Sequence, residues 1–275
     1  MHRKLAVVDA RVAFIGGINI VDDLDEPGLL SPRHDYAVHI EGPLLGPIHE
    51  EAQRLWSKVA WVSLRHRWHP RVKLAPVTAP VGTQRAALLI RDNFRHRAEI
   101  ENAYLEAIAS AQDEIVIANA YFFPGQRLRR ALMDASQRGV RVVLLLQGRV
   151  EHALLHYASR ALYGSLIDAG IEIHVYQQSY LHAKVAVIDG RWSTVGSSNI
   201  DPFSLLVARE ANVAIDDREF AATLRASLHH ALEEGAWLIR PQAWHSQPLL
   251  LRLRIWLAYG LSRLLIGLAG YGGLQ

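Results

Sequence analysis

A stretch at the start of the chain recurs 180 residues later with its polar residues in register. The first copy, from residue 2, reads HRKLAVVDARVAFIGGIN, and the second, from residue 182, reads HAKVAVIDGRWSTVGSSN. Self-similarity at a fixed offset indicates that one structural unit occurs twice in the fold. We therefore expect two related halves, with the chemistry of the repeated residues present in duplicate.

The matched polar residues define the motif. Each copy has a histidine, a lysine two residues later and an aspartate five residues after that, followed by an asparagine behind small residues. The pairs are His2 and His182, Lys4 and Lys184, Asp9 and Asp189, and Asn19 and Asn199. Two further segments, HDYAV and REANV, match as the next pieces and place an acid before a strand-like run, Asp35 in one and Glu210 in the other.

The chain before and around the second copy alternates between strand and helix patterns. The predicted strands are 86–92, 114–122, 140–148, 171–176, 182–189, 191–199 and 211–215, and the predicted helices are 96–111, 126–138, 152–169 and 218–235. The run VRVVLLLQG is nearly all apolar, as is typical of a strand covered on both faces. This alternation predicts an α/β layered domain.

No such series precedes the first copy, which begins at residue 2. We therefore predict that residues 1–80 are the later part of a first α/β domain that is incomplete at its N-terminus. Residues 81–245 are predicted to form a complete second domain, and residues 246–275 an apolar, arginine-containing tail. The sheet of the first domain is expected to have an exposed edge, which is a liability for aggregation.

A histidine and a lysine two residues apart in a strand point to the same face. An ammonium group neutralises phosphate oxygens, and an imidazole can act on the phosphorus or on the bridging oxygen. A single His-x-Lys is weak evidence for such a site, because histidine is usually structural or at the surface. Because the whole set is repeated in register, we predict a catalytic site that acts on a phosphate group.

The other repeated residues are expected to support this chemistry. The two aspartates lie an odd number of residues from the histidines, before a turn, and are expected to brace the loop by hydrogen bonds. The two asparagines follow small residues and can donate to phosphate oxygens. Asp35 and Glu210 are the candidates to orient the imidazoles by accepting a hydrogen bond.

Both motifs resemble the paired HKD motifs of the phospholipase D superfamily. Within it, DYAVHIEGP, IANAYFFPG, VGSSNIDPFSL and EANVAIDDREF are most similar to bacterial cardiolipin synthases of the B type. The resemblance implies two α-β-α sandwich domains related by a pseudo-twofold axis, with both motifs at their interface. It also implies a cytoplasmic-membrane enzyme of bacteria, peripheral or anchored in the interface, that needs no cofactor.

The implied reaction has two steps. One of His2 and His182 attacks phosphorus to give a phosphatidyl-histidine, and the other protonates the leaving alcohol and then acts as base for the acceptor alcohol. Sequence position does not decide which histidine is the nucleophile. With phosphatidylglycerol as donor and acceptor the products would be cardiolipin and glycerol, whereas water as acceptor would make the enzyme a phospholipase.

Two segments point to a membrane surface. Residues 54–70 mix three tryptophans with basic residues, which suits anionic headgroups, although a half-buried helix packed on the second domain is the alternative. Residues 249–271 are long enough to span a bilayer but contain Arg252, Arg254 and Arg263. We expect this tail to lie in the interface rather than to span the membrane, with a helix docked on the domain as the alternative.

Other features limit the alternatives. The chain has no cysteine and no HExxH or GxxxxGK[ST] motif, so we predict no metal site and no phosphate-binding loop. A nuclease or phosphodiesterase could use the same motifs, but the tryptophan-rich segment and the apolar tail favour lipid over nucleic acid. An inactive truncated form also stays open, as does a homodimer in which two second domains make a symmetric site.

Overall fold

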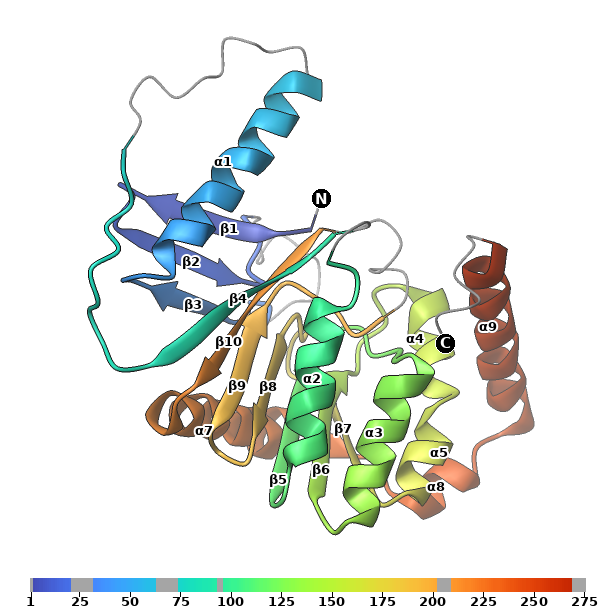
Figure 1. Cartoon of the computed structure of the whole chain (residues 1–275). Helices are drawn as coiled ribbons and strands as arrows, with labels where there is room; N and C mark the ends of the chain where they lie inside the picture. Colours follow the sequence, from blue (N-terminus) through green and yellow to red (C-terminus); the bar gives the residue numbers. More distant parts are fainter. Residues whose placement is uncertain (1, 21–31, 63–73, 93–95, 202–208, 269–275) are drawn as a thin grey trace.

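The two copies of the repeat lie in two different sheets of the computed structural model, which describes residues 2–20, 32–62, 74–92, 96–201 and 209–268 (Figure 1). A three-stranded sheet has the order β1 (Lys4–Val8), β2 (Val12–Gly16) and β3 (Ala37–Ile40). An eight-stranded sheet contains β4 (Arg85–Arg91), β5 (Glu114–Asn119), β6 (Arg141–Gln147), β7 (Glu172–Tyr176), β8 (Lys184–Ile188), β9 (Trp192–Gly196), β10 (Glu210–Asp216) and β11 (Ala236–Leu238). Its order is β11-β7-β6-β5-β8-β9-β10-β4.

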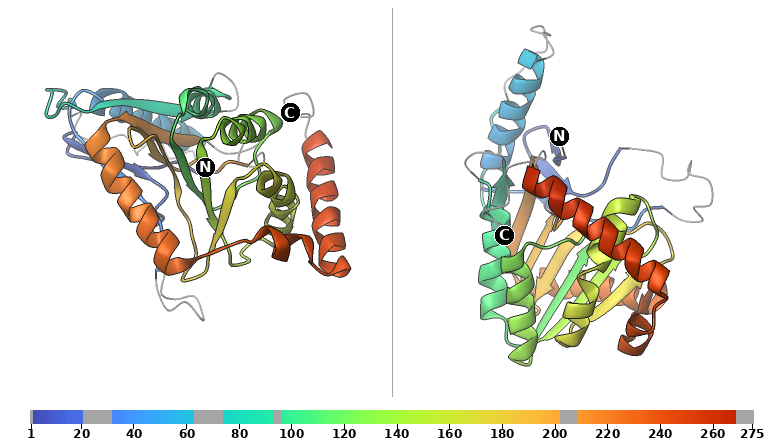
Figure 2. Two further views of the ribbon diagram at one scale, coloured as in Figure 1. Left: turned by 90° about the horizontal axis from the view of Figure 1, so that it is seen from below. Right: turned by 90° about the vertical axis from the view of Figure 1, so that its right-hand side faces the viewer.

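Helices cover both faces of the larger sheet. These are α2 (Glu99–Ser110), α3 (Gln126–Gln137), α4 (Ala153–Arg160), α5 (Tyr163–Asp168) and α7 (Arg218–Gly235). Helix α1 (Leu45–Val62) packs on β1 and β2 of the smaller sheet, while α8 (Pro241–His245) contacts α5 and α9 (Leu249–Leu268) contacts α4. Figure 2 shows α2 to α5 on one face and α7 on the other. Successive residues of β5 enter opposite cores, Ile115 and Ile117 on the α2 side and Val116 and Ala118 on the α7 side. The prediction of an α/β fold with strands covered on both faces is therefore confirmed.

The three motif strands have the same register in both halves. Leu5 pairs with Ile15 as Val185 pairs with Val195. Across the next ladder, Gly16 pairs with Ala37 as Gly196 pairs with Asn212. Asp35 and Glu210 each lie two residues before the paired position on their strand. They are therefore structurally equivalent, as the sequence predicted.

The halves differ on the outer side of the motif strand. In the larger sheet β8 lies between β9 and β5, both of which are antiparallel to it. Within the described residues, β1 pairs with β2 alone and forms the edge of its sheet. The expected exposed edge is thus present at β1.

Two boundary predictions are wrong. The helix expected over 152–169 is two helices, because bonds of Ala161 N–H to the Ala158 carbonyl and Leu162 N–H to the Ser159 carbonyl tighten its last turn and end α4. The motif strands are also shorter than predicted. They begin at Lys4 and Lys184, so both histidines lie just before their strands.

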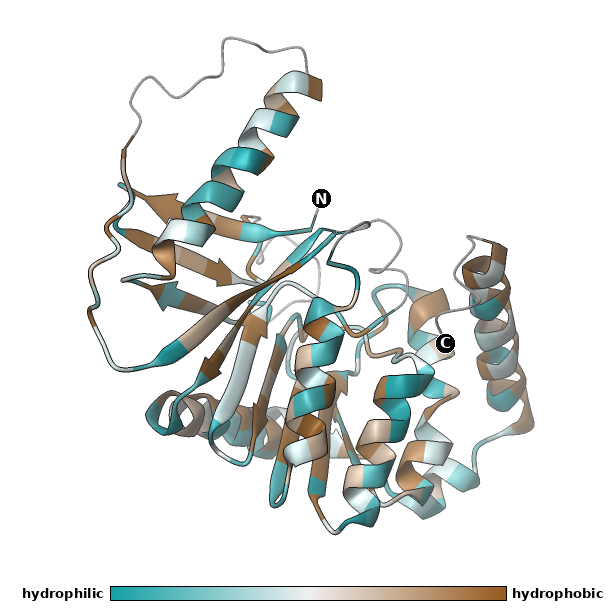
Figure 3. Cartoon of the chain, in the orientation of Figure 1, coloured by the Kyte–Doolittle hydropathy of each residue, from teal (hydrophilic) through white to brown (hydrophobic). Residues whose placement is uncertain are grey.

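Helix α9 packs along α4 and buries Ile255, Ser262 and Ile266 (Figure 2). Its outer side carries a leucine stripe at positions spaced three and four residues apart: Leu250, Leu253, Leu257, Leu261, Leu264 and Leu268. Figure 3 shows these apolar positions alternating with polar ones along the helix. Among the helices that the structure describes, none is long and apolar enough to cross a membrane.

Helix α1 contains the first part of the tryptophan-rich segment, while 63–70 lies outside the described residues. Trp61 is 72% exposed and Trp56 is 48% exposed. The alternative in which these tryptophans are buried against the second domain is therefore wrong for Trp61. Its ring is available at the surface.

Candidate active site

His182 is held by an acid from the other half of the chain. Its Nδ1 lies 2.6 Å from Oδ2 of Asp35, and both side chains are buried. The backbone explains this approach. The His34 N–H donates to the Tyr180 carbonyl and the His182 N–H donates to the His34 carbonyl, each at 2.8 Å. This pairing fixes Asp35 next to the imidazole.

The equivalent contact in the first copy is looser and also crosses between halves. His2 Nδ1 lies 3.4 Å from Oε1 of Glu210, and the histidine side chain is 46% exposed whereas the glutamate is fully buried. The other carboxylate oxygen, Oε2, accepts a hydrogen bond of 2.5 Å from the Ser197 hydroxyl. Burial, the largest influence, raises the pKa of Glu210 to about 7, although Ser197 and Lys4 act in the opposite direction.

Each imidazole is thus paired with the acid of the opposite repeat. Sequence reasoning identified Asp35 and Glu210 as candidate orienters, but it did not say which acid would meet which ring. A carboxylate that accepts from Nδ1–H leaves Nε2 of the same ring free to act on a substrate. For His182 this contact is a hydrogen bond, whereas for His2 the Oε1 atom of Glu210 lies within ion-pair distance and makes no hydrogen bond among the described residues.

The two lysines fold back towards the main chain of their own motif. Lys4 Nζ donates to the His2 carbonyl at 2.9 Å and lies 3.5 Å from Nδ1 of the same residue. Lys184 is fully buried and donates to the His182 carbonyl. The predicted proximity of ammonium and imidazole is therefore present in the first copy, and in the second the ammonium lies at the histidine backbone.

Electrostatic coupling shows that the two motifs form one cluster. Burial, the largest influence, and the nearby charges of Lys4, Lys184 and His182 together lower the pKa of His2 to about 4. Burial likewise lowers the pKa of Lys184 to about 7, partly offset by Asp35. An anionic phosphate between the motifs would stabilise the charged form of both lysines.

The two motif aspartates have different surroundings. The Asp189 carboxylate accepts hydrogen bonds from the backbone N–H groups of Gln112, Asp113 and Glu114, at 2.9, 2.9 and 3.0 Å. It ties the β8–β9 turn to the start of β5 and does not reach the histidines. Asp9 is exposed and makes no hydrogen bond or ion pair with any residue that the structure describes.

The two asparagines also differ. Asn199 is buried, and its Oδ1 has no hydrogen-bond partner among the described residues. Asn19 is exposed and contacts none of the cluster in the described part of the chain. The two equivalent asparagines therefore differ in burial, and only Asn199 has a buried side chain.

Sequence reasoning missed Arg3, which lies between His2 and Lys4. Its side chain is 2% exposed and forms an ion pair with Glu51 of α1. It also donates to the carbonyls of Glu210, at 2.9 Å, and Arg91, at 3.2 Å. Arg3 therefore joins the first copy to the strands that carry Glu210. The sequence could have pointed to Arg3, because HRK and HAK differ only at the middle position, where Ala183 is the equivalent residue.

The described residues contain no group of three or more His, Cys, Asp or Glu side chains arranged to hold a metal ion. The groups gathered here are two imidazoles, two ammonium groups, two carboxylates and one amide. Such a set can bind a phosphodiester, provide a nucleophile and move a proton.

A family model described as "Cardiolipin synthase, PLD-like domain" matches residues 104–232. This part of the chain therefore belongs to the phospholipase D-like domains of the cardiolipin synthase family. The chain is 42% identical to cardiolipin synthase B of Escherichia coli K12 over 230 residues, which is 83% of this chain and 55% of that protein. It is 29% identical to cardiolipin synthase 1 of Staphylococcus epidermidis, covering 96% of this chain and 53% of the relative.

The chain thus spans about half the length of these relatives. Among solved structures, phosphatidylserine synthase from Haemophilus influenzae superposes with a TM-score of 0.68, covering 96% of this chain and 70% of that one at 12% identity. At this identity the likeness concerns the fold alone. It supports a mixed α/β fold.

Proposed function

We propose that this chain is a phosphatidyltransferase that makes cardiolipin from two molecules of phosphatidylglycerol and releases glycerol. The observation that carries the proposal is the crosswise holding of His182 by Asp35 and of His2 by Glu210. That arrangement suits two imidazoles acting on one phosphodiester from opposite sides. Its organisation would be two pseudo-twofold-related α-β-α halves, residues 1–80 and 81–245, followed by the 246–275 tail.

In the first step, Nε2 of one histidine attacks the phosphorus of phosphatidylglycerol. The bond from phosphorus to the glycerol headgroup oxygen breaks, and the other histidine donates the proton that the leaving glycerol needs. In the second step, that histidine removes a proton from the hydroxyl of a second phosphatidylglycerol, whose oxygen displaces the first imidazole. Lys4 and Lys184 stabilise the phosphate oxygens throughout.

The test is the product formed by purified protein on phosphatidylglycerol vesicles. Mass spectrometry should find cardiolipin and free glycerol in a ratio near one to one. Phosphatidic acid without cardiolipin would assign the site to hydrolysis, and nicking of plasmid DNA without turnover of lipid would assign it to a nuclease. Either result would overturn the proposed transfer reaction.

A lipid substrate requires access to a membrane surface, and the outer stripe of α9 is suited to that role. An exposed leucine stripe with Arg254 beside it matches a helix that lies at the headgroup boundary. The protein would then be peripheral on the bacterial cytoplasmic membrane. Flotation with phosphatidylglycerol vesicles should be lost in a Leu253→Gln, Leu257→Gln, Leu264→Gln variant and kept in Val81→Gln, which changes an exposed apolar residue elsewhere. Flotation of both would contradict the assignment.

A further inference from the structure

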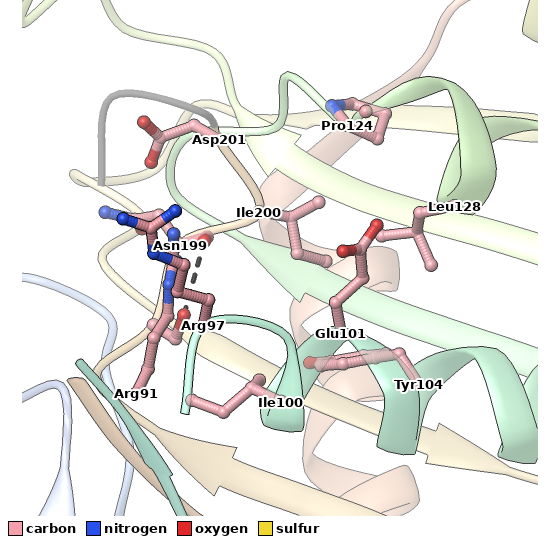
Figure 4. Close-up of a pocket in the computed structure, with 12 residues that line it drawn as sticks. Arg91, Arg97, Ile100, Glu101, Tyr104, Pro124, Leu128, Asn199, Ile200 and Asp201 are labelled. Carbon is pink, nitrogen blue, oxygen red and sulfur yellow. Dashed lines mark hydrogen bonds between the residues drawn. The ribbon is translucent and has the colours of Figure 1, made fainter. Parts of the chain in front are cut away.

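A pocket opens between α2, the start of α3 and the segment that follows β9 (Figure 4). Its cavity volume is about 50 Å³, which is several times what one bound water needs and suits a small molecule. Seven residues with polar side chains line it: Arg91, Arg97, Glu101, Tyr104, Ser198, Asn199 and Asp201. None of the first four belongs to the repeated motif, and no step described above uses the pocket.

The pocket lies next to the reacting groups. Arg91 is paired with Glu210 across the β4–β10 ladder, and the charges of Arg91 and Asp201 both influence the Glu210 carboxyl. Asn199, a residue of the repeated motif, also lines the pocket. A ligand in the pocket would therefore lie beside the Glu210–His2 pair.

The charges of the lining exclude a simple anion site. Two arginines are matched by two carboxylates, Glu101 and Asp201, so the lining is neutral overall. Figure 4 shows the arginines next to Asn199 and the Glu101 carboxylate on the opposite side, near Leu128. A lining that holds both donors and acceptors suits a neutral ligand whose groups both donate and accept, which is the property of a hydroxyl.

Two buried polar atoms in the lining have no hydrogen-bond partner among the described residues. They are the Tyr104 hydroxyl, on a side chain that is 2% exposed, and Oδ1 of Asn199, on one that is 4% exposed. Leaving such buried atoms unpaired destabilises the folded protein. A phenol O–H donates and an amide oxygen accepts, so one hydroxyl-bearing ligand can satisfy both. The apolar side chains of Ile100 and Leu128 would pack against its carbon atoms.

We propose that this pocket is the subsite for the acceptor alcohol, and that it binds the glycerol part of the acceptor. The inference rests on the proposed transfer reaction and adds where the second substrate is recognised. Water can reach a phosphohistidine without such a site, whereas a polyol needs positioning. The pocket should therefore control which fraction of the phosphohistidine reacts with the alcohol and which fraction reacts with water.

The experiment supplies full-length protein with phosphatidylglycerol vesicles and deuterated glycerol. Mass spectrometry then follows two products, deuterated phosphatidylglycerol from transfer to glycerol and phosphatidic acid from hydrolysis. Tyr104→Phe and Glu101→Gln should each lower the ratio of transfer to hydrolysis by about fivefold or more, as expected for one lost hydrogen bond of about 1 kcal/mol. Total donor turnover should stay near that of the wild type.

Glu106→Gln is the matched control, because Glu106 lies on the same helix but is exposed and does not line the pocket. It should leave the ratio unchanged. An unchanged ratio in both Tyr104→Phe and Glu101→Gln, with turnover retained, would overturn the subsite. Glu101 is only partly buried, so Glu101→Gln keeps the test valid if Tyr104→Phe does not fold.

Binding of glycerol, followed by saturation-transfer NMR on the same proteins, does not depend on turnover. The wild type and Glu106→Gln should give a signal that weakens in Tyr104→Phe and Glu101→Gln. If the wild type shows no turnover but this binding pattern appears, the transfer reaction fails while the polyol site stands. Equal signals in all four proteins would refute the polyol site.

Discussion

The two copies of the motif differ more in their surroundings than in their residues. In the second copy His182 and Lys184 are buried, and Asp189 is bound to three backbone N–H groups. In the first copy His2 is half exposed and Asp9 is at the surface. The cause is the neighbour of the motif strand, since β8 has β5 beside it and β1 has no second strand among the described residues.

The motif strands place the crosswise carboxylates, whereas the surrounding sheet determines how deeply each motif is buried. The crosswise acids are present in both copies, because the motif strands and Asp35 or Glu210 have the same register in each. Only in the second copy, whose motif strand has a neighbour on both sides, are the histidine and lysine buried and the aspartate bound to backbone N–H groups. Chemistry should therefore be shared by the two copies, while stability should depend mainly on the second.

The largest expected effect concerns the shared chemistry. His2→Ala and His182→Ala should each reduce phosphatidyl transfer by about 100- to 10,000-fold, because each removes a nucleophile or an acid–base group. Initial rates on phosphatidylglycerol vesicles measure this, with circular dichroism to check folding. Full turnover in both variants would refute the paired assignment.

The next effect concerns Arg3, which joins the halves. Arg3→Met should lower the free energy of unfolding by about 3 kcal/mol, because it leaves the largely buried Glu51 carboxylate without its main partner and removes the donor to the Glu210 and Arg91 carbonyls of the second half. Arg54→Met removes an exposed partner of the same carboxylate and should cost at most about 1 kcal/mol. Urea denaturation compares the two, and equal losses would mean that Arg3 does not hold the halves together.

Replacement of the motif aspartates tests the difference in bracing. Asp189→Asn should lower the free energy of unfolding by about 1–2 kcal/mol, because a neutral amide replaces a charged acceptor of three hydrogen bonds. Asp9→Asn should change it by less than about 0.5 kcal/mol. Both aspartates have a positive φ, near 50°, which asparagine tolerates, so backbone strain is matched. Similar losses would contradict the proposed asymmetry.

The smallest effect is in the pH dependence. Burial raises the pKa of Glu210 to about 7, so the carboxylate that holds His2 becomes protonated as the pH falls below that value. Burial lowers the pKa of Lys184 to about 7, so its charge is lost as the pH rises. The value of kcat/KM should therefore be highest near pH 7 and fall on both sides.

Glu210→Gln should have lower activity and should lack the acidic limb. The same group affects stability with a definite sign. A carboxyl with a raised pKa stabilises the folded protein at low pH, and this contribution is lost as the pH rises through about 7. The free energy of unfolding of the wild type should thus fall more between pH 5 and 8 than that of Glu210→Gln. An identical fall would contradict the assigned titration.

Much of the fold could be predicted from the sequence, because apolar runs and helix periodicity determine elements locally. The helix over 218–235 was predicted at its observed bounds, while the break after Arg160 was missed because a local turn, not hydropathy, produces it. The repeat identified Asp35 and Glu210, but crosswise pairing depends on the His34–Tyr180 backbone contact between distant segments. The exposure of Asn19 could not be predicted, because both copies have the same local pattern.

The central claim is that one phosphodiester lies between the two imidazoles. A crystal structure of the protein with bound inorganic phosphate tests it most directly. The account predicts a single phosphate within hydrogen-bond distance of Nε2 of both His2 and His182, about 3 Å. A phosphate that contacts only one ring, with the other facing a separate surface, would contradict it.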